Sequence, residues 1–141
     1  MRDVEIDSTG NVYVLGRECD GDPVVNPNPS SEDNCEVVLY KLSGTDGSVI
    51  MTKLFPFLYH AYELELDEED GMLFFSSSMQ DGQSSDDGTF VCNNNVVPDE
   101  VCSVTMAVDL EGNIIWARTL DHLDLYGFFT GSIMVAHNHD G

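Results

Sequence analysis

The segment DVEIDSTGNVYVLG, residues 3–16, predicts a tight β-hairpin near the start of the chain. Acidic and apolar residues alternate before the turn, and alternation with a period of two is typical of a β-strand. Ser8, Thr9 and Gly10 interrupt this pattern, and a glycine at this place supplies the positive φ that a short hairpin turn needs. The apolar run that follows predicts the returning strand.

The same pattern recurs along the chain. YELELDEEDGMLFFSS, residues 62–77, again alternates acidic and apolar residues before a glycine turn, and SIMVAHNHDG, residues 132–141, begins a third copy. A second kind of segment also recurs: CEVVLYKLSGTDGSVIMTKLF, residues 35–55, and CSVTMAVDLEGNIIWARTL, residues 102–120, each contain two strands joined by a glycine-bearing turn. Self-similarity of this kind indicates a repeat architecture. Each repeat therefore consists of four strands.

These repeats predict an all-β fold of four-stranded antiparallel units, two of them complete and followed by the first strand of a third. The units occupy residues 1–60, 61–130 and 131–141, and the last segment is either the start of a third unit or a strand that pairs with another subunit. Long loops are expected at residues 18–34 and 76–91. Connections rich in aromatic residues, at 55–62 and 125–132, are interpreted as packing between neighbouring units rather than as a ligand platform.

The composition is that of a globular but very acidic protein. The 141 residues are 42% hydrophobic, and 26 acidic residues against 5 basic ones give a formal net charge of −21. Such a charge repels nucleic acids and anionic membrane surfaces, and it attracts cations. Acidity also suits a protein of a salty extracellular medium. Because the chain starts directly in strand-like sequence, we expect either a leader that has been removed or a segment of a longer chain.

The four cysteines occupy matching places in the two complete units. Four cysteines allow three pairings, and the repeat favours Cys19 with Cys35 and Cys92 with Cys102, so that one bond clips the long loop of each unit. Each bond would contribute about 3 kcal/mol in the chain-entropy model. A zinc site is the alternative, but the cysteine spacing lacks the close pairs that zinc sites use. Disulfides predict an oxidising, extracellular or secreted location.

Several segments resemble repeats of known β-propeller families. LYKLSGTDGSVI (39–50) and AVDLEGNIIWARTL (107–120) resemble the quinoprotein-type repeat, and STGNVYVLG (8–16) resembles the Gly-Asn-Val-Tyr-Val turn of bacterial seven-bladed propellers. The resemblance covers most of the chain outside the long loops, and it implies that the units are propeller-blade-like. The two units differ at Trp116, because Ile50 or Met51 stands at the matching place in the first unit. No quinone-site constellation is present, so the resemblance implies a fold and no catalysis.

Carboxylates on one strand face are the leading candidates for a binding site. The first strand of each complete unit carries three of them, Asp3, Glu5 and Asp7 in one and Glu63, Glu65 and Asp67 in the other. We expect these groups to face water, a channel or a bound cation, because carboxylates on adjacent strands repel one another without a counter-ion. Calcium prefers such oxygen ligands, which makes Glu5, Asp7, Glu65 and Asp67 its candidate ligands. The alternative is a solvated acidic face.

Motifs for catalysis are absent from the sequence. His137 and His139 form a His-x-His pair that could hold a metal, but solvated histidines at a hairpin tip are the simpler interpretation; His60 and His122 stand apart. No nucleophile-elbow serine, phosphate-binding glycine loop or Walker-type lysine is visible. The sequence therefore predicts no enzyme activity and no cofactor, with calcium as the one candidate ligand.

The sequence as a whole predicts a non-catalytic, extracellular structural or interaction module. Two units and a strand cannot close a propeller ring, so neighbouring copies or further repeats of the same chain are the expected partners, in a head-to-tail ring or fibre. Neither nucleic acid binding nor membrane insertion is expected. The alternatives are a fragment of a propeller enzyme or ligand-binding protein, such as a quinoprotein-like oxidoreductase or a lectin, or a calcium-dependent adhesion module.

Overall fold

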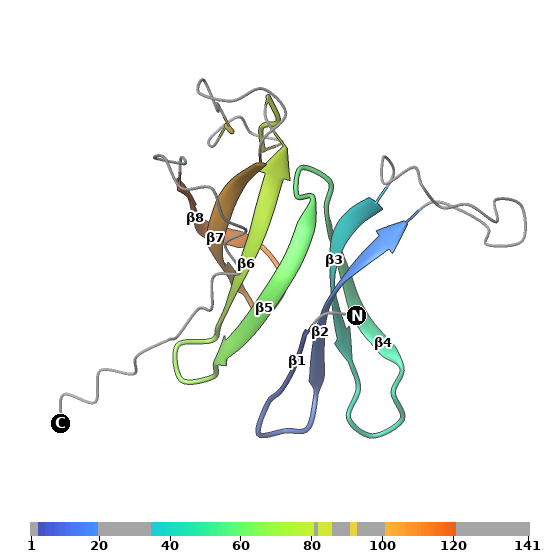
Figure 1. Cartoon of the computed structure of the whole chain (residues 1–141). Coiled ribbons are helices and arrows are strands. Elements are labelled where there is room, and N and C mark those ends of the chain that lie inside the picture. Colours follow the sequence, from blue (N-terminus) through green and yellow to red (C-terminus); the bar gives the residue numbers. More distant parts are fainter. Residues whose placement is uncertain (1–2, 20–34, 81, 86–90, 93–100, 121–141) are drawn as a thin grey trace, which may run out of the picture.

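The described part of the protein consists of two four-stranded antiparallel sheets (Figure 1). The computed structural model describes residues 3–19, 35–80, 82–85, 91–92 and 101–120. Each sheet has its strands in chain order. The first contains β1 (Asp3–Ile6), β2 (Val12–Cys19), β3 (Cys35–Leu42) and β4 (Val49–Phe55), and the second contains β5 (His60–Asp67), β6 (Met72–Gln80), β7 (Val101–Asp109) and β8 (Ile114–Leu120). The all-β fold of four-stranded antiparallel units is confirmed, whereas the segment 131–141 lies outside the described residues.

Two of the hairpins share one turn motif, Asp-x-x-Gly-Asn. Asp7 Oδ1 accepts hydrogen bonds from the backbone N–H of Thr9 (3.0 Å) and Asn11 (2.8 Å), which closes the β1–β2 turn. Asp109 Oδ1 bonds the N–H groups of Glu111 (3.0 Å) and Asn113 (2.7 Å) in the same way between β7 and β8. Aspartate side chains commonly stabilise turns by such local bonds. The glycine of each motif has a positive φ, so these turns follow directly from the local sequence.

The two sheets have the same strand order and, over the rows that both contain, the same register; β5 has one further bulge, between Ala61 and Leu64. In the first sheet Glu5, Tyr13, Lys41 and Met51 lie side by side across the four strands, and in the second Glu65, Phe74, Ala107 and Trp116 do so. A β-bulge follows at the same place in both sheets, between Lys41 and Leu42 and between Ala107 and Val108. Residues in matching rows are therefore structural counterparts. The counterpart of Trp116 is Met51, not Ile50.

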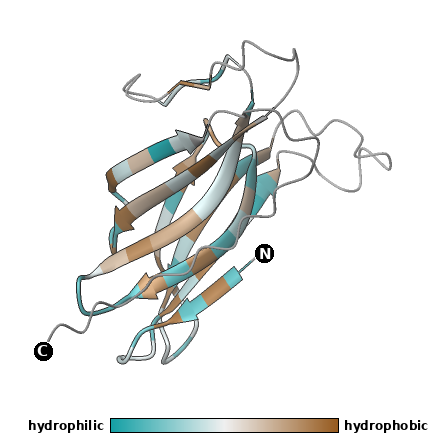
Figure 2. Ribbon diagram, turned by 60° about the vertical axis from the view of Figure 1, so that its left-hand side comes forward, coloured by the Kyte–Doolittle hydropathy of each residue, from teal (hydrophilic) through white to brown (hydrophobic). Residues whose placement is uncertain are grey.

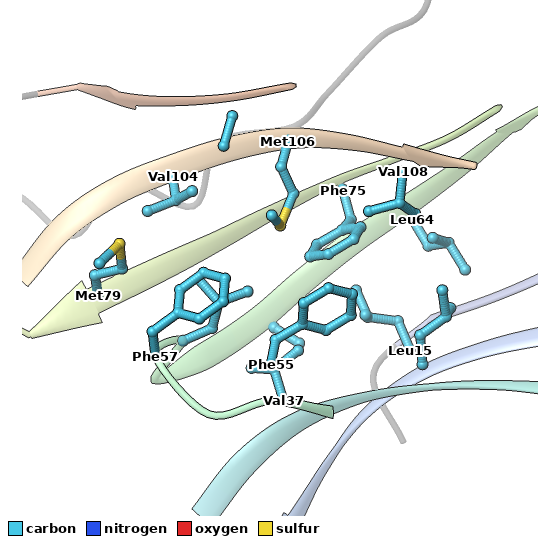
Figure 3. Close-up of a cluster of buried hydrophobic side chains, with 14 of the residues drawn as sticks. Leu15, Val37, Phe55, Phe57, Leu64, Phe75, Met79, Val104, Met106 and Val108 are labelled. Atoms are coloured by element: carbon cyan, nitrogen blue, oxygen red, sulfur yellow. The ribbon is translucent and has the colours of Figure 1, made fainter. Parts of the chain in front are cut away.

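The sheets stack face to face around one hydrophobic core (Figure 3). Leu15, Val37 and Phe55 contribute from the first sheet, and their side chains meet Phe75 and Met106 of the second. The rings of Phe55 and Phe75 lie 5.4 Å apart between centroids. Phe57 and Leu58 of the connection between β4 and β5 are also buried in this core. This part of the aromatic connection packs between the units, as the sequence indicates.

Counterpart residues show that the two sheets are stacked in the same orientation, so that they meet through faces that are not counterparts of each other. The first sheet packs with the face that carries Tyr13. The second packs with the opposite face, which carries Phe75, and the counterpart of Phe75 is Val14 on the far side of the first sheet. We call that far side the outer face of the first sheet and the side carrying Phe74 and Trp116 the outer face of the second. Neither face is covered by the other sheet, although Val38 on the first and Ser76 and Ala107 on the second are buried within the chain.

Strand β6 continues further than its sequence suggests. The loop expected from residue 76 starts only after Gln80, because Ser76, Ser77 and Ser78 pair with β7 and are buried. Serine is not among the residues enriched in strands, but its small side chain fits a covered sheet, and the Ser77 hydroxyl donates to the backbone carbonyl of His60. Pairing across the whole β6–β7 ladder outweighs the local preference.

Two disulfides clip the two units. Cys19 in β2 bonds its direct cross-strand partner Cys35 in β3. Cys102 in β7 bonds Cys92, which follows a short ladder in which Ser84 pairs with Val91. This is the pairing that the repeat favours, and it uses all four cysteines of the chain. Two disulfides suit a non-reducing environment.

Candidate functional site

The predicted acidic site lies where β1 runs beside β5 (Figure 1). Asp3, Glu5 and Asp7 are half-buried, whereas Val4 and Ile6 on the other side of β1 are exposed. Figure 2 shows this alternation of hydrophilic and hydrophobic residues along the strand beside the N-terminus. The acidic side of β1 is thus its packed side.

Asp3 and Glu5 have different surroundings within this acidic side. Asp3 Oδ2 accepts a hydrogen bond of 2.9 Å from the backbone N–H of Leu64, so the carboxylate joins the first sheet to β5 of the second. Partial burial raises the pKa of Glu5 above its ordinary value, and the negative charges of Glu65 and Asp3 raise it further. We call Asp3, Glu5 and Glu65 the acidic seam. One of its carboxylates is bonded, and the two glutamates repel each other.

Asp7 belongs to a turn rather than to the acidic seam. Its Oδ1 accepts from the N–H of Thr9 and Asn11 and from the Thr9 hydroxyl, and its Oδ2 accepts from Asn11 Nδ2 at 2.9 Å. Partial burial would raise the pKa of Asp7, but the hydrogen bonds from Asn11 and Thr9 outweigh it and lower the pKa to about 2. Asp67, also buried, accepts from the N–H of Asp70 at 3.1 Å within the β5–β6 turn. Both aspartates therefore serve their hairpins.

These placements separate the four candidate calcium ligands. Glu5 and Glu65 meet in the acidic seam, while Asp7 and Asp67 are engaged in two different turns. Within the described part of the chain, no three acidic, histidine or cysteine side chains are grouped so that they could hold a metal ion. Calcium binding stays a prediction. His122, His137 and His139 lie outside the described residues.

His60 lies at the start of β5 among aromatic rings. Its ring is 4.2 Å from that of Tyr59 and stacks at 6.1 Å on that of Tyr62. The guanidinium of Arg17 lies over the Tyr59 ring at 5.0 Å from the centroid. Cation–π and stacking contacts of this kind hold the β4–β5 connection against β2. The arrangement explains the aromatic residues of this connection by packing.

Two contacts between the units could not be read from the sequence. The backbone N–H of Ser8 lies 3.0 Å from both carboxylate oxygens of Glu68, and its hydroxyl donates to the same group, which ties the β1–β2 turn to the β5–β6 turn. A Cβ added to Gly112 would lie 2.9 Å from the side chain of Lys53, so the lysine packs directly over the β7–β8 turn. No local pattern signals pairs so distant in the chain.

Lys53 also interacts electrostatically with this turn. Burial would raise the pKa of Asp109, but hydrogen bonds from Asn113 and Glu111 and the positive charge of Lys53 together lower it. The first sheet therefore contacts the second through an apolar centre and a charged periphery. The counterpart of Lys53 in the second sheet is Arg118, which is exposed on that sheet's outer face.

Among the described residues, the outer face of the first sheet exposes several large apolar side chains. Ile6 is 61% exposed, Val49 59%, Leu54 45% and Val4 40%. Val12, Val14, Tyr40 and Leu42 beside them are only half-buried. Apolar side chains that gather on one sheet face mark a surface for contact, whereas scattered ones would not. The alternation of residues in β1 predicts two faces but not which of them is covered, so this face does not follow from the sequence.

Comparison with models of protein families, with curated proteins and with solved structures found no match for this chain. None of the described residues forms a helix long and apolar enough to cross a membrane.

Proposed function

We propose that this protein is a non-catalytic, extracellular structural or interaction module of β-propeller-type repeats, which assembles head-to-tail with copies of itself or with further repeats into a ring or a fibre. The observation that carries the proposal is the exposed apolar outer face of the first sheet, with Ile6 at 61% and Leu54 at 45% exposure. Full burial of a side chain of this size contributes about 1.5–3 kcal/mol. Several of them on one face provide enough free energy for a specific contact.

Charge sets the conditions for this assembly. The formal net charge of −21 opposes the approach of two copies. Salt weakens that repulsion, because exposed charges are screened beyond about 8 Å at physiological ionic strength. Burial of apolar side chains is not screened in this way. Assembly should therefore become stronger as the salt concentration rises.

The extracellular location is supported by the two disulfides and by the acidity. Disulfides persist in oxidising compartments, where small domains use them in place of a large core. Each of the two units buries only one of its sheet faces in the other unit, which is a small core for a stable domain. Cross-links at Cys19–Cys35 and Cys92–Cys102 reduce the free energy that this core must supply.

The oligomeric state of the unmodified chain tests the proposal. Multi-angle light scattering after gel filtration, over a wide range of protein concentrations and at about 0.15 M and 1 M salt, should show species larger than one chain that grow with concentration and salt. Electron microscopy of those species would separate a ring from a fibre. A molar mass that stays at one chain under all these conditions would contradict the proposed function.

A further inference from the structure

We propose that the outer face of the first sheet binds the outer face of the second sheet of another copy, in the same arrangement that the two sheets have within one chain. This inference rests on the proposed function and names the two surfaces that meet. It makes the contact heterologous, so that every copy offers one surface of each kind.

The first support is the comparison of counterpart residues. Leu64, Phe75 and Met106 are buried in the second sheet because the first sheet covers them. Their counterparts on the outer face of the first sheet are also apolar or aromatic but lie partly in solvent: Val4, Val14 and Tyr40. Val38, the counterpart of Val104, lies on the same face but is already buried within the chain. The outer face of the first sheet therefore has the apolar character and the register of the covered face of the second sheet. Another sheet could pack on it as the first sheet packs on the second.

The second support is the surface that would cover this face. Within the chain, the covering surface is the side of the first sheet that carries Tyr13 and Met51, and its counterpart is the outer face of the second sheet. There Phe74 and Trp116 stand at the matching places, with ring centroids 6.1 Å apart, and Trp116 is 36% exposed. An aromatic pair of this kind is a typical anchor of a protein interface.

The outer face of the second sheet is more polar than its counterpart. Ser76 and Thr105 stand where the first sheet has Leu15 and Leu39. The contact between copies should therefore be weaker than the contact within the chain, and it should depend on protein concentration. A reversible contact explains why an apolar face can be left open on a single chain.

The third support is a matching pair of charges. Inside the chain, Lys53 packs over Gly112 and acts on the nearby charge of Asp109. Between copies, the counterpart of Lys53 is Arg118, and it would lie over the β3–β4 turn, where Gly47 corresponds to Gly112. Space around Gly47 is open.

Asp46 beside Gly47 supplies the negative charge for Arg118. It is fully exposed, and the hydroxyl and N–H of Ser48 donate to its Oδ1 at 2.8 and 3.1 Å. These hydrogen bonds lower the pKa of Asp46 below its ordinary value, and the carboxylate is negatively charged at neutral pH. Arg118 of one copy over Asp46 of the next would pair opposite charges over the turn, as Lys53 and Asp109 do within the chain, although the direct counterpart of Asp109 is Ser43.

Two complementary variants test which faces meet. Ile6→Lys with Leu54→Lys blocks the outer face of the first sheet, and Trp116→Lys blocks that of the second; all three positions are exposed. Each blocked variant alone should be monomeric. An equimolar mixture should give 1:1 dimers and nothing larger, because only one intact face of each kind remains. Ser84→Lys, an exposed position in the short ladder after β6, controls for the added charge and should assemble as the unmodified chain does.

The outcomes separate this inference from the proposed function. If the unmodified chain assembles but a mixture of the two blocked variants stays monomeric, the pairing of these faces is wrong. Homodimers of either blocked variant would show that like faces pair, and they would also overturn the inference. An unmodified chain that is always monomeric would overturn the proposed function itself. Circular dichroism and disulfide content show that each variant is folded before it is scored.

A charge swap provides an independent readout. Arg118→Glu and Asp46→Arg should each weaken assembly about fivefold, as expected for an exposed ion pair. The double variant should return to within about twofold of the unmodified chain, since it restores the pair with reversed sign. A double variant that assembles less well than either single variant would place Arg118 and Asp46 apart and overturn the geometry of the inference.

Discussion

The two sheets have the same strand order, register and bulge, yet they differ sharply in what covers their counterpart faces. Leu64 in the second sheet is 3% exposed, and its counterpart Val4 in the first is 40% exposed. The chemistry at both positions is apolar, so the difference comes from the neighbour and not from the residue. One chain thus contains both a covered and an open copy of the same surface, and each can serve as the control for the other.

The largest expected loss of stability comes from a substitution in the core, on the covered face of the second sheet. Leu64→Ala should destabilise the folded chain by about 2–5 kcal/mol, because it leaves a cavity among buried side chains. Val4→Ala, at the counterpart position, should cost less than about 1 kcal/mol because the side chain already contacts water. Urea unfolding followed by circular dichroism measures both. Equal losses would contradict the difference in cover between the two faces.

Removing each disulfide in turn compares how much the bond of each unit stabilises the fold. The bonds join residues 16 and 10 positions apart, so the chain-entropy model gives about 3.1 and about 2.7 kcal/mol. Cys92 and Cys102 are buried, however, while Cys19 is exposed. Replacing the second pair by alanine should therefore cost at least as much as replacing the first, despite the shorter loop. Thermal unfolding of the two double variants provides the test, and a clearly larger loss for the first pair would show that loop entropy alone decides.

Acid should remove the stabilising contribution of the Asp7 carboxylate to the β1–β2 turn. The pKa of Asp7 is about 2 in the folded chain and 3.8 in the reference state, so its carboxylate stabilises the fold above about pH 4, and this contribution is lost as the pH falls through about 2. Because the group is partly solvated, we expect about 1–2 kcal/mol. Asp7→Ala should lose that amount at pH 7 and much less at pH 2 in urea unfolding. A loss independent of pH would assign the effect to packing.

A change in the acidic seam should have the smallest effect on the stability of the fold, and that effect should be opposite in sign to the one at Asp7. The pKa of Glu5 is raised by burial and by Glu65 and Asp3, so ionisation of Glu5 disfavours the fold as the pH rises through its folded pKa, and the penalty is absent below its ordinary pKa. Glu5→Gln should therefore stabilise the chain at pH 7 by a few tenths of a kcal/mol, and the gain should vanish in acid. The same unfolding experiment at pH 7 and pH 3 measures it. Destabilisation at pH 7 would mean that Glu5 has a favourable partner, such as a bound cation.

Much of the fold could be predicted because its elements are local. The Asp-x-x-Gly-Asn turns are stabilised by bonds between residues at most four positions apart, and alternating residues mark the strands beside them. The repeat then predicts the four-strand units and the cysteine pairing, because residues at the same place in the two repeats are expected to adopt the same structure. The sequence predicts Asp7 as a candidate calcium ligand, and the structure places its carboxylate in hydrogen bonds with Thr9 and Asn11, two near neighbours in the chain.

The amino-acid sequence by itself determined the turns, the two units, their disulfides and most of the strands, because these depend on near neighbours and on repetition. Only the tertiary structure decided which face of each strand is covered. A strand with alternating residues can present either side to a neighbour, and the stacking of the second sheet on the first made the acidic side of β1 its packed side. The same stacking brought Lys53 over Gly112 and Ser8 to Glu68, and it left Ile6 and Leu54 exposed on an open apolar face.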